Sequence, residues 1–400
     1  MSKIGVHVSA GNRRGFGEFL KKCADAGSPV PVVFSVDQDV WPDTQTLSPQ
    51  TIVVFRHQVK DPEGGGQDAP GDTYVGDPLQ SARTWLAANL VSWRKNRAHY
   101  YAPINEQDAG TLAGYTWLND FSVECLRIAD AEGFKLALYG FSGGNPRDGV
   151  TDLDRSTLEQ KWERLLPSLR YAKAHGHCLL LHEYGFDSPA ANGGPATSLR
   201  ASAPNLATRY RRSYRFLQQF NADPPLVISE SGPGVGGFAE IGVDPWLADA
   251  KWYDGELMQD QMIVLGCCLY QLGGVENIRE GLDALGNYIA ATPTPIAPLI
   301  ESIAPPIKSI APLDFEVRLI RCRPEPAIDR PNGIILTFEI TATGGTAPYT
   351  YISEGQTLAG PTRERSATRQ GAVIESYTVT DASGQSLQRK FFFSSREFPC

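Results

Sequence analysis

Two glutamates stand at the carboxyl ends of predicted buried strands. Glu106 closes the aromatic run HYYAPINE, directly after Asn105, and Glu230 lies in VISESG. A carboxylate at the end of a buried strand is partly removed from water, which costs free energy unless the group is paired or used. Two such carboxyl groups, one protonated and one ionised, are what the cleavage of a glycosidic bond requires.

Eight β-rich runs recur in the first 290 residues and would position these side chains. The predicted strands are 4–8, 30–37, 51–57, 99–106, 134–141, 177–186, 225–232 and 265–274. Apolar residues at three- and four-residue spacing predict helices at 16–27, 79–96, 117–133, 158–176, 206–222 and 252–266, whereas the second crossover has little helical pattern. Eight alternating units predict an α/β fold, a (β/α)8 TIM barrel over residues 1–290.

The predicted loops differ between the two ends of this barrel. Helix-to-strand connections are short, whereas several strand-to-helix connections are long and rich in Gly, Pro and Asp, as in 58–78, 142–157, 187–205 and 233–245. Long loops at the carboxyl ends of the strands are typical of a barrel whose active site lies at that rim. Glu106, on the fourth strand, and Glu230, on the seventh, would both project over it.

The pattern changes after the barrel. Residues 291–312 form a Pro-rich linker with repeated Ile-Ala-Pro units, and 313–400 alternate apolar and polar residues between turn signals. This second part predicts a small all-β sandwich resembling immunoglobulin-like modules of bacterial surface and secreted proteins. We expect a spacer rather than a glycan-binding module, because no exposed aromatic row is evident. Cys322 and Cys400 bracket the sandwich and could pair.

Composition excludes several classes of partner. A net charge of -8 without basic runs disfavours nucleic acid and anionic membranes. No stretch approaches the roughly 20 apolar residues of a membrane span. The opening residues show no secretory leader, so either the protein is not exported by that route or a leader is missing from this sequence, whereas the β-module favours an extracellular location. The seven cysteines show no metal-binding spacing, and we expect no metal and no organic cofactor.

The strand-end motifs resemble those of the clan A glycoside hydrolases, retaining (β/α)8 enzymes that act on β-linked sugars. The resemblance covers about residues 4–290 and implies that Glu106 is the acid/base, Asn105 holds the sugar 2-hydroxyl and Glu230 is the nucleophile. It also implies site roles for His57, at the end of the third strand, and for Tyr184, which would bond the nucleophile. The second strand ends in SVDQD and lacks the clan's arginine, so Arg56 would supply the cation.

Further residues are candidates without a motif of their own. His182 and Glu183 end the sixth strand, and Glu183 is the rival of Glu230 for the second carboxylate. Sugar rings stack on aromatic side chains, so aromatics that end or follow strands are candidates for substrate binding, among them Tyr139, Tyr184, Trp246 and Tyr270. His7, on the first strand, fits a core position as well as a site position.

Two other functions remain open. IGVHVSAG resembles the first strand of endonuclease IV-like barrels, which bind two or three metal ions, but only a few histidines stand at strand ends. A non-catalytic carbohydrate-binding or structural barrel of a surface or virion assembly would not need a pair of glutamates. The sequence therefore favours an endo-acting glycosidase with a carbohydrate as its partner.

Overall fold

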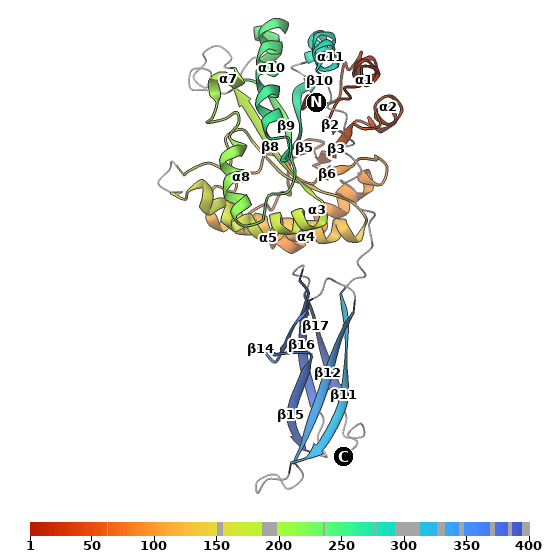
Figure 1. Cartoon of the computed structure of the whole chain (residues 1–400), viewed down its shortest axis with the longest axis vertical. Helices are drawn as coiled ribbons and strands as arrows, with labels where there is room; N and C mark the ends of the chain where they lie inside the picture. Colours follow the sequence, from red (N-terminus) through yellow and green to blue (C-terminus); the bar gives the residue numbers. More distant parts are fainter. Residues whose placement is uncertain are drawn as a thin grey trace. The chain divides into compact units, whose positions relative to one another are not determined.

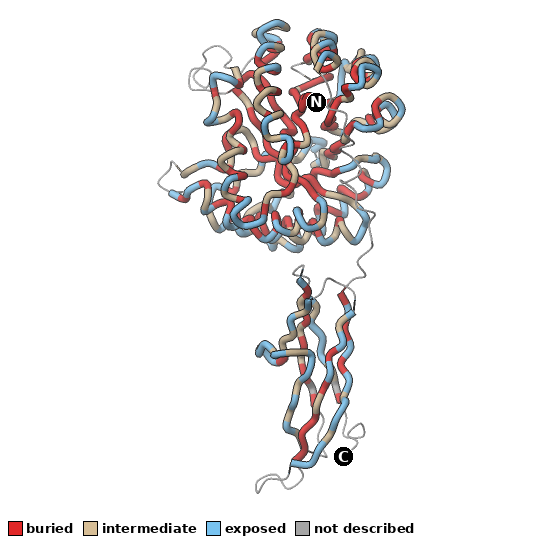
Figure 2. The backbone as a smooth tube through the Cα atoms, viewed as in Figure 1, coloured by how far each residue is buried: buried red, intermediate tan, exposed pale blue. Residues whose placement is uncertain are grey.

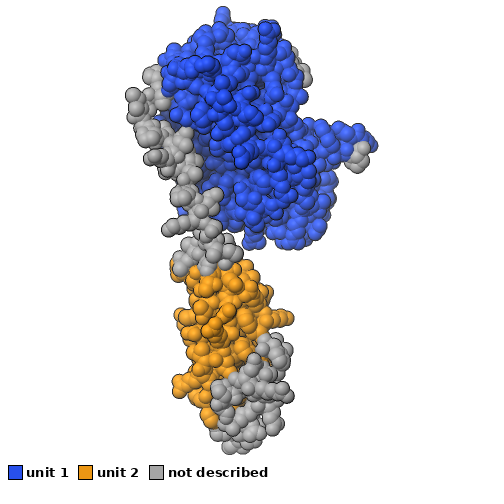
Figure 3. Space-filling model, turned by 90° about the vertical axis from the view of Figure 1, so that its right-hand side faces the viewer, with its two compact units in different colours: residues 1–300 blue, residues 301–400 orange. Residues whose placement is uncertain are grey.

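The fold is described from a computed structural model of the 400-residue chain. The structure describes residues 1–61, 63–149, 155–185, 198–234, 237–274, 277–292, 313–325, 333–343, 348–368, 373–382 and 386–393. The chain divides into two compact units, Met1–Ile300 and Glu301–Cys400 (Figure 3). Most of the Pro-rich segment 291–312 lies outside the described residues.

Eight parallel strands form the sheet of the first unit (Figure 1). They are β1 (Ile4–Val8), β2 (Val32–Val36), β3 (Ile52–Arg56), β6 (Tyr100–Ala102), β7 (Ala137–Phe141), β8 (Cys178–Gly185), β9 (Leu226–Pro233) and β10 (Val264–Leu272). Their order is β6-β3-β2-β1-β10-β9-β8-β7. The two end strands meet in a bridge between Tyr101 and Leu136, where the Tyr101 N–H donates to the Lys135 carbonyl at 2.8 Å. The predicted TIM barrel is therefore confirmed.

Helices of very different length cover the strands. They are α1 (Phe16–Asp25), α2 (Trp41–Leu47), α3 (Pro78–Trp93), α4 (Leu112–Ala131), α5 (Leu158–His175), α7 (Leu199–Ser202), α8 (Tyr210–Gln219), α9 (Gly237–Ile241), α10 (Val243–Gln259), η1 (Ile278–Gly281) and α11 (Leu282–Ala291). A two-strand hairpin, β4 (Val59–Lys60) with β5 (Gly66–Gln67), lies in the loop after β3. The weak second crossover is the seven-residue α2. The predicted helix 252–266 was placed too late, since α10 begins at Val243.

Side chains of the strands alternate between two apolar layers. One cluster holds strand residues alone and fills the barrel interior, with Phe34, Tyr100, Cys178, Leu180 and Val227 among its members. The residues between them face outward and join the larger cluster that includes the helices. Figure 2 shows the strands as the buried centre and the outer helix faces as exposed. This alternation decides which strand-end residues reach the barrel mouth.

The second unit is all-β. One sheet has the order β11 (Asp314–Pro324), β12 (Gly333–Thr343), β15 (Thr362–Thr368), and the other the order β14 (Gln356–Thr357), β13 (Thr350–Ser353), β16 (Val373–Thr380), β17 (Ser386–Phe393). Apolar side chains of both sheets share one core cluster. The small all-β module is thus confirmed, and its immunoglobulin-like nature stays a prediction.

The cysteines follow the expected division. Cys322 is in a disulfide bond, while Cys400, proposed as its partner, lies outside the described residues. Five cysteines of the barrel are free and buried: Cys23, Cys125, Cys178, Cys267 and Cys268. None of the described helices has the length and apolar character needed to cross a membrane.

Candidate active site

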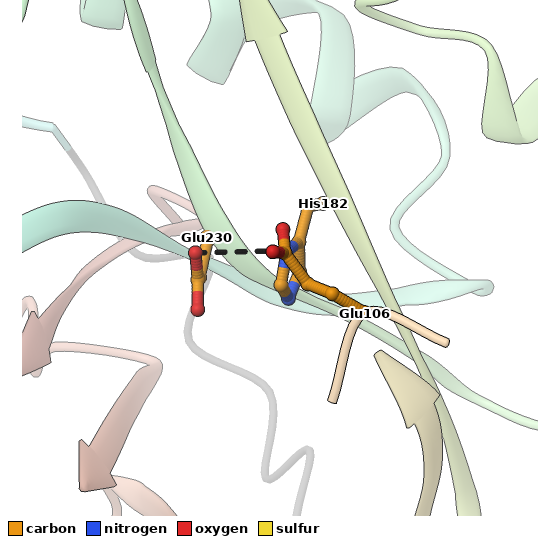
Figure 4. Close-up of side chains that lie close together, drawn as sticks. All are labelled: Glu106, His182 and Glu230. Atoms are coloured by element: carbon orange, nitrogen blue, oxygen red, sulfur yellow. Dashed lines mark hydrogen bonds and ion pairs between the residues drawn. The ribbon is translucent and has the colours of Figure 1, made fainter. Parts of the chain in front are cut away.

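Glu106, His182 and Glu230 converge at the carboxyl ends of the strands (Figure 4). Glu230 lies in β9 directly beside His182 of β8, and Glu106 follows β6 from the other side of the barrel mouth. One oxygen of each carboxylate and a ring nitrogen of the histidine all lie within 4.8 Å of one another. His182 Nδ1 is 2.9 Å from Glu106 Oε1 and 3.6 Å from Glu230 Oε2. The histidine therefore lies beside both carboxylates.

Glu230 occupies a buried and electropositive position. The Tyr184 hydroxyl donates to its Oε2 at 2.8 Å, and His7 Nε2 lies 3.7 Å from its Oε1. Burial opposes ionisation of this carboxyl, but His182, His7, the Tyr184 hydroxyl and Arg56 together outweigh it, so the pKa of Glu230 is lowered. Its side chain is only 10% exposed. These contacts keep Glu230 ionised and hold it in one orientation.

Glu106 has a more open environment. Its side chain is 42% exposed, and its backbone has a positive φ of 50°. The Glu106 N–H donates to the Gly140 carbonyl at 2.8 Å, which ties the end of β6 to β7. Asn105 is buried, and its N–H donates to the Asp68 carbonyl at 2.8 Å. Both residues are thus fixed through their backbones while the Glu106 carboxyl faces the open mouth.

The two predicted residues of β3 occupy different places. Arg56 is buried and forms an ion pair with Asp68. Burial lowers the pKa of its guanidinium, while the negative charges of Glu230 and Glu106 oppose this shift. The cation is therefore close enough to interact electrostatically with both glutamates. His57 lies instead against Asp37, with its Nδ1 2.6 Å from Asp37 Oδ1, at the rim after β2 and β3. Among the described residues its ionic partner is Asp37, and it forms no hydrogen bond or ion pair with either glutamate.

Among the predicted aromatic residues, Tyr184 and Tyr270 reach the site. The ring of Tyr270, in β10, lies 5.0 Å from that of His7 and 6.1 Å from that of Tyr184. Tyr139 was predicted wrongly. It has φ 75° and Gly140 has φ 59°, which breaks the alternation of β7 and turns the Tyr139 ring outward. The ring is fully buried, and its hydroxyl is 2.5 Å from Ser168 Oγ in α5.

Trp246 is also no substrate-binding residue. It was expected as an aromatic residue that follows the seventh strand, but it lies in the first turn of α10 and is 1% exposed. Its indole packs edge-on against Phe238, with ring centroids 5.2 Å apart, and approaches Gly281. A sugar cannot stack on this ring, because protein covers it.

Glu183, the rival second carboxylate, points away from the barrel mouth. The N–H groups of Thr208 and Tyr210 donate to it at 2.6 and 2.9 Å, and the Tyr253 hydroxyl donates as well. Burial raises the pKa of Glu183 to about 7, although these three donors favour its ionised form. Strand alternation places His182 and Tyr184 inside and Glu183 among the outer helices, where it anchors the start of α8. This rival is therefore excluded.

His7 belongs to the site, although its sequence context fitted the core equally well. It is buried between Phe34 and Tyr270, and burial lowers its pKa to about 4, although the negative charge of Glu230 opposes this shift. Asp37 and Asp68, which pair with His57 and Arg56, were not singled out from the sequence. The inward parity of His7 in IGVHV was the signal that could have identified it.

The same three side chains offer donors to a metal ion. Within the described parts of the chain, Glu106, His182 and Glu230 are the one group of three or more metal-binding side chains whose donor atoms come this close. Carboxylate and imidazole donors suit several divalent ions. A site for two or three ions would need a second set of ligands around them.

No family model matches the chain, and no curated protein matches it. Among solved structures, it is similar to a double mutant of an endo-beta-1,4-mannanase from Cellulomonas fimi, with 14% identity over 96% of this chain and 93% of that one and a TM-score of 0.41. It is also similar to a GH18 chitinase mutant from Cycas revoluta, with 11% identity, coverage of 72% and 98%, and a TM-score of 0.43. A beta-1,3-glucanase and allergen of Cryptomeria japonica pollen has 12% identity, coverage of 68% and 89%, and a TM-score of 0.39.

Proposed function

We propose that the barrel is a retaining glycoside hydrolase that cleaves β-linked oligo- or polysaccharides. The carrying observation is the approach of Glu106 and Glu230, whose nearest carboxylate oxygens lie within 4.8 Å. Retaining enzymes hold their two carboxyl groups about 5–5.5 Å apart, whereas inverting enzymes leave about 6.5–9.5 Å for a water. The short separation supports a double displacement, in which one glutamate attacks the sugar directly.

Their surroundings support different roles for the two glutamates. Glu230 is buried and held ionised by its neighbours, as a nucleophile must be. Glu106 is more exposed and contacts His182, so it can exchange protons with solvent. In the first step Glu106 protonates the leaving oxygen, the glycosidic C–O bond breaks, and a Glu230 oxygen bonds to the anomeric carbon. In the second, Glu106 takes a proton from water, and the water oxygen displaces Glu230.

The remaining site residues fit a sugar substrate. The charge of Arg56 acts on both glutamates, Asn105 directly precedes Glu106, and the rings of Tyr184 and Tyr270 lie near each other at the site. Apolar faces of sugars stack on such rings while their hydroxyls bind polar groups. The long rim loops favour a polysaccharide chain and endo-action.

The test is a substrate screen with matched variants. Wild type, Glu106→Gln, Glu230→Gly and the exposed-surface control Glu163→Gln are assayed on mannan, xylan, β-glucans and aryl β-glycosides. We expect the first two variants to lose about 10²–10⁴-fold or more in kcat/KM on the cleaved substrate, and the control to match wild type. NMR of the first product should show the β-anomer. An active Glu230→Gly variant, or an α-anomer as first product, would contradict the assignment.

Metal-dependent chemistry is the second candidate, because the donor atoms of Glu106, His182 and Glu230 could hold an ion. Metal analysis of the purified protein and phosphodiester assays with added Mg²⁺, Mn²⁺ or Zn²⁺ distinguish the two. Glycan cleavage that withstands EDTA supports the glycosidase, and phosphodiester cleavage that EDTA abolishes supports the metal enzyme.

A further inference from the structure

A hollow lies at the amino-terminal end of the barrel, away from the glutamates. It has a volume of about 410 Å³ and is bounded by α2, the end of α3 and the segments that enter β6 and β7. The seven-residue α2 at its border spans only about 10 Å. Neither Glu106 nor Glu230 lines this hollow, and the catalytic end of β6 faces the opposite way.

Aromatic rings form its floor. Trp41 packs on His99 with ring centroids 5.0 Å apart, and Trp93 packs on Tyr101 at 5.1 Å. Phe134 lies edge-on to Tyr101 at 4.9 Å. Trp93 and Tyr101 are buried, whereas Trp41, His99 and Phe134 are partly or fully exposed. The exposed ring surfaces of the hollow therefore rest on buried rings that hold them in place.

Its rim is basic. Arg94, Arg97 and Lys135 line the hollow, and none of its lining residues is acidic. Arg94 and Lys135 are paired with Glu132 and Asp130. Within the described ranges no carboxylate forms an ion pair with Arg97. In a chain of net charge -8, one uncompensated guanidinium beside exposed rings favours a ligand that has both a flat apolar face and a negative charge.

We propose that this hollow is a secondary binding site for one acidic sugar unit of a polysaccharide, separate from the catalytic mouth. The apolar face of the pyranose ring stacks on Trp41 and Phe134, and the Arg97 guanidinium binds the carboxylate. The choice of a sugar over other flat anions rests on the proposed function. Such a site would hold a uronate-containing chain on the barrel while another part of the chain enters the mouth.

The experiment separates this binding from catalysis. The full-length Glu230→Gln variant, used to prevent turnover, is titrated with polygalacturonate oligomers, with their methyl esters, and with polyglutamate as an anion without sugar rings. Calorimetry and tryptophan fluorescence report binding. We expect the oligomers to bind about tenfold more tightly than either comparison ligand. Adding Arg97→Gln should remove that preference, whereas adding Arg215→Gln, an exposed arginine on α8, should not.

Several outcomes would overturn the site. They are no binding of the oligomers, equal binding of the methyl esters or polyglutamate, or binding unchanged by Arg97→Gln. Trp41→Ala should also weaken binding, and thermal melts show whether that variant stays folded. If it does not fold, the surface variant Arg97→Gln still tests the site. If wild type cleaves none of the glycans in the substrate screen while the oligomers still bind through Arg97, the proposed function fails and the binding site stands.

Discussion

The hydrogen bond from Tyr184 to Glu230 is the shortest polar contact of the buried glutamate. It measures 2.8 Å, while the nearest nitrogens of His182 and His7 lie 3.6 and 3.7 Å away. It favours the ionised carboxylate and so contributes to the lowered pKa of Glu230. Tyr184 acts through Glu230, which makes it a positioning residue as well as a ring at the site.

Tyr184→Phe should therefore change the pH profile as well as the rate. Removing the hydroxyl raises the pKa of Glu230, so the acidic limb of kcat/KM moves to higher pH and the loss is greatest in acid. The loss of one hydrogen bond to a charged group predicts a decrease of about 10- to 100-fold. Kinetics between pH 4 and 8 on the substrate found in the screen measure both effects.

Tyr214→Phe is the matched control for this prediction. Its hydroxyl donates to the Pro224 carbonyl at 2.6 Å in the core, remote from the glutamates. Its removal should lower the free energy of unfolding by about 1 kcal/mol and leave the pH profile unchanged. A Tyr184→Phe variant that loses rate equally at every pH would show that Tyr184 does not act through the charge of Glu230.

Regular strand alternation was enough to predict which side chains of β8 reach the site. The inward positions of β8 give His182 and Tyr184 and exclude Glu183. Tyr139 was wrongly predicted to face the site because two successive residues with positive φ interrupt β7. The tripeptide Leu-Tyr-Gly does not predict this interruption. His7 was left undecided because a buried histidine has the same sequence context in a core and in a site.

At the level of elements, the irregular part of β7 supports the catalytic end of β6. The Gly140 carbonyl accepts the Glu106 N–H, and a Cβ added at Gly140 would lie 3.2 Å from Asn105 Oδ1. Gly140 also has φ 59°, a conformation that costs other residues about 1–2 kcal/mol. Glycine is therefore favoured at position 140 for two reasons: its positive φ and the lack of space for a side chain beside Asn105.

Gly140→Ala should consequently reduce activity more than its effect on stability implies. The added methyl crowds the Asn105 side-chain oxygen directly beside Glu106, and a small misplacement of groups at a catalytic site lowers the rate. Gly176→Ala is the control, since Gly176 ends α5 with φ 73° and an added Cβ meets nothing within 4 Å. Both variants should lose about 1–2 kcal/mol in denaturant unfolding, but only Gly140→Ala should lose kcat/KM. Equal activity in the two would contradict this role of β7.

The eight strands were predictable because buried parallel strands are continuous apolar runs, and each prediction overlaps its observed strand. Helices were less well defined. The start of α10 at Val243 was missed because Gly242 and Pro245 suggested a loop, yet Pro is tolerated in the first turn of a helix. α11 was not predicted at all, since its ten residues run directly into the Pro-rich segment.

At the scale of the whole molecule, the candidate catalytic residues belong to only one of the two compact units. Glu106, Glu230, His182 and Arg56 all belong to the first unit, and each unit has its own apolar core. The β-module has a buried charge of its own, Glu375, which is paired with Arg365 inside that module. The contacts that the described residues make with Glu106 and Glu230 lie within the first unit.

A chain ending at Thr292 should accordingly fold and retain catalysis. α11, which ends at Ala291, still packs on α1 through Gly286 and Phe19, so the barrel keeps its last helix. On soluble oligosaccharides we expect kcat/KM equal to that of the full chain, with a cooperative thermal transition. A change on insoluble polysaccharide alone would assign the β-module to substrate access, whereas loss of the thermal transition or of activity on soluble substrate would show that the barrel depends on the second unit.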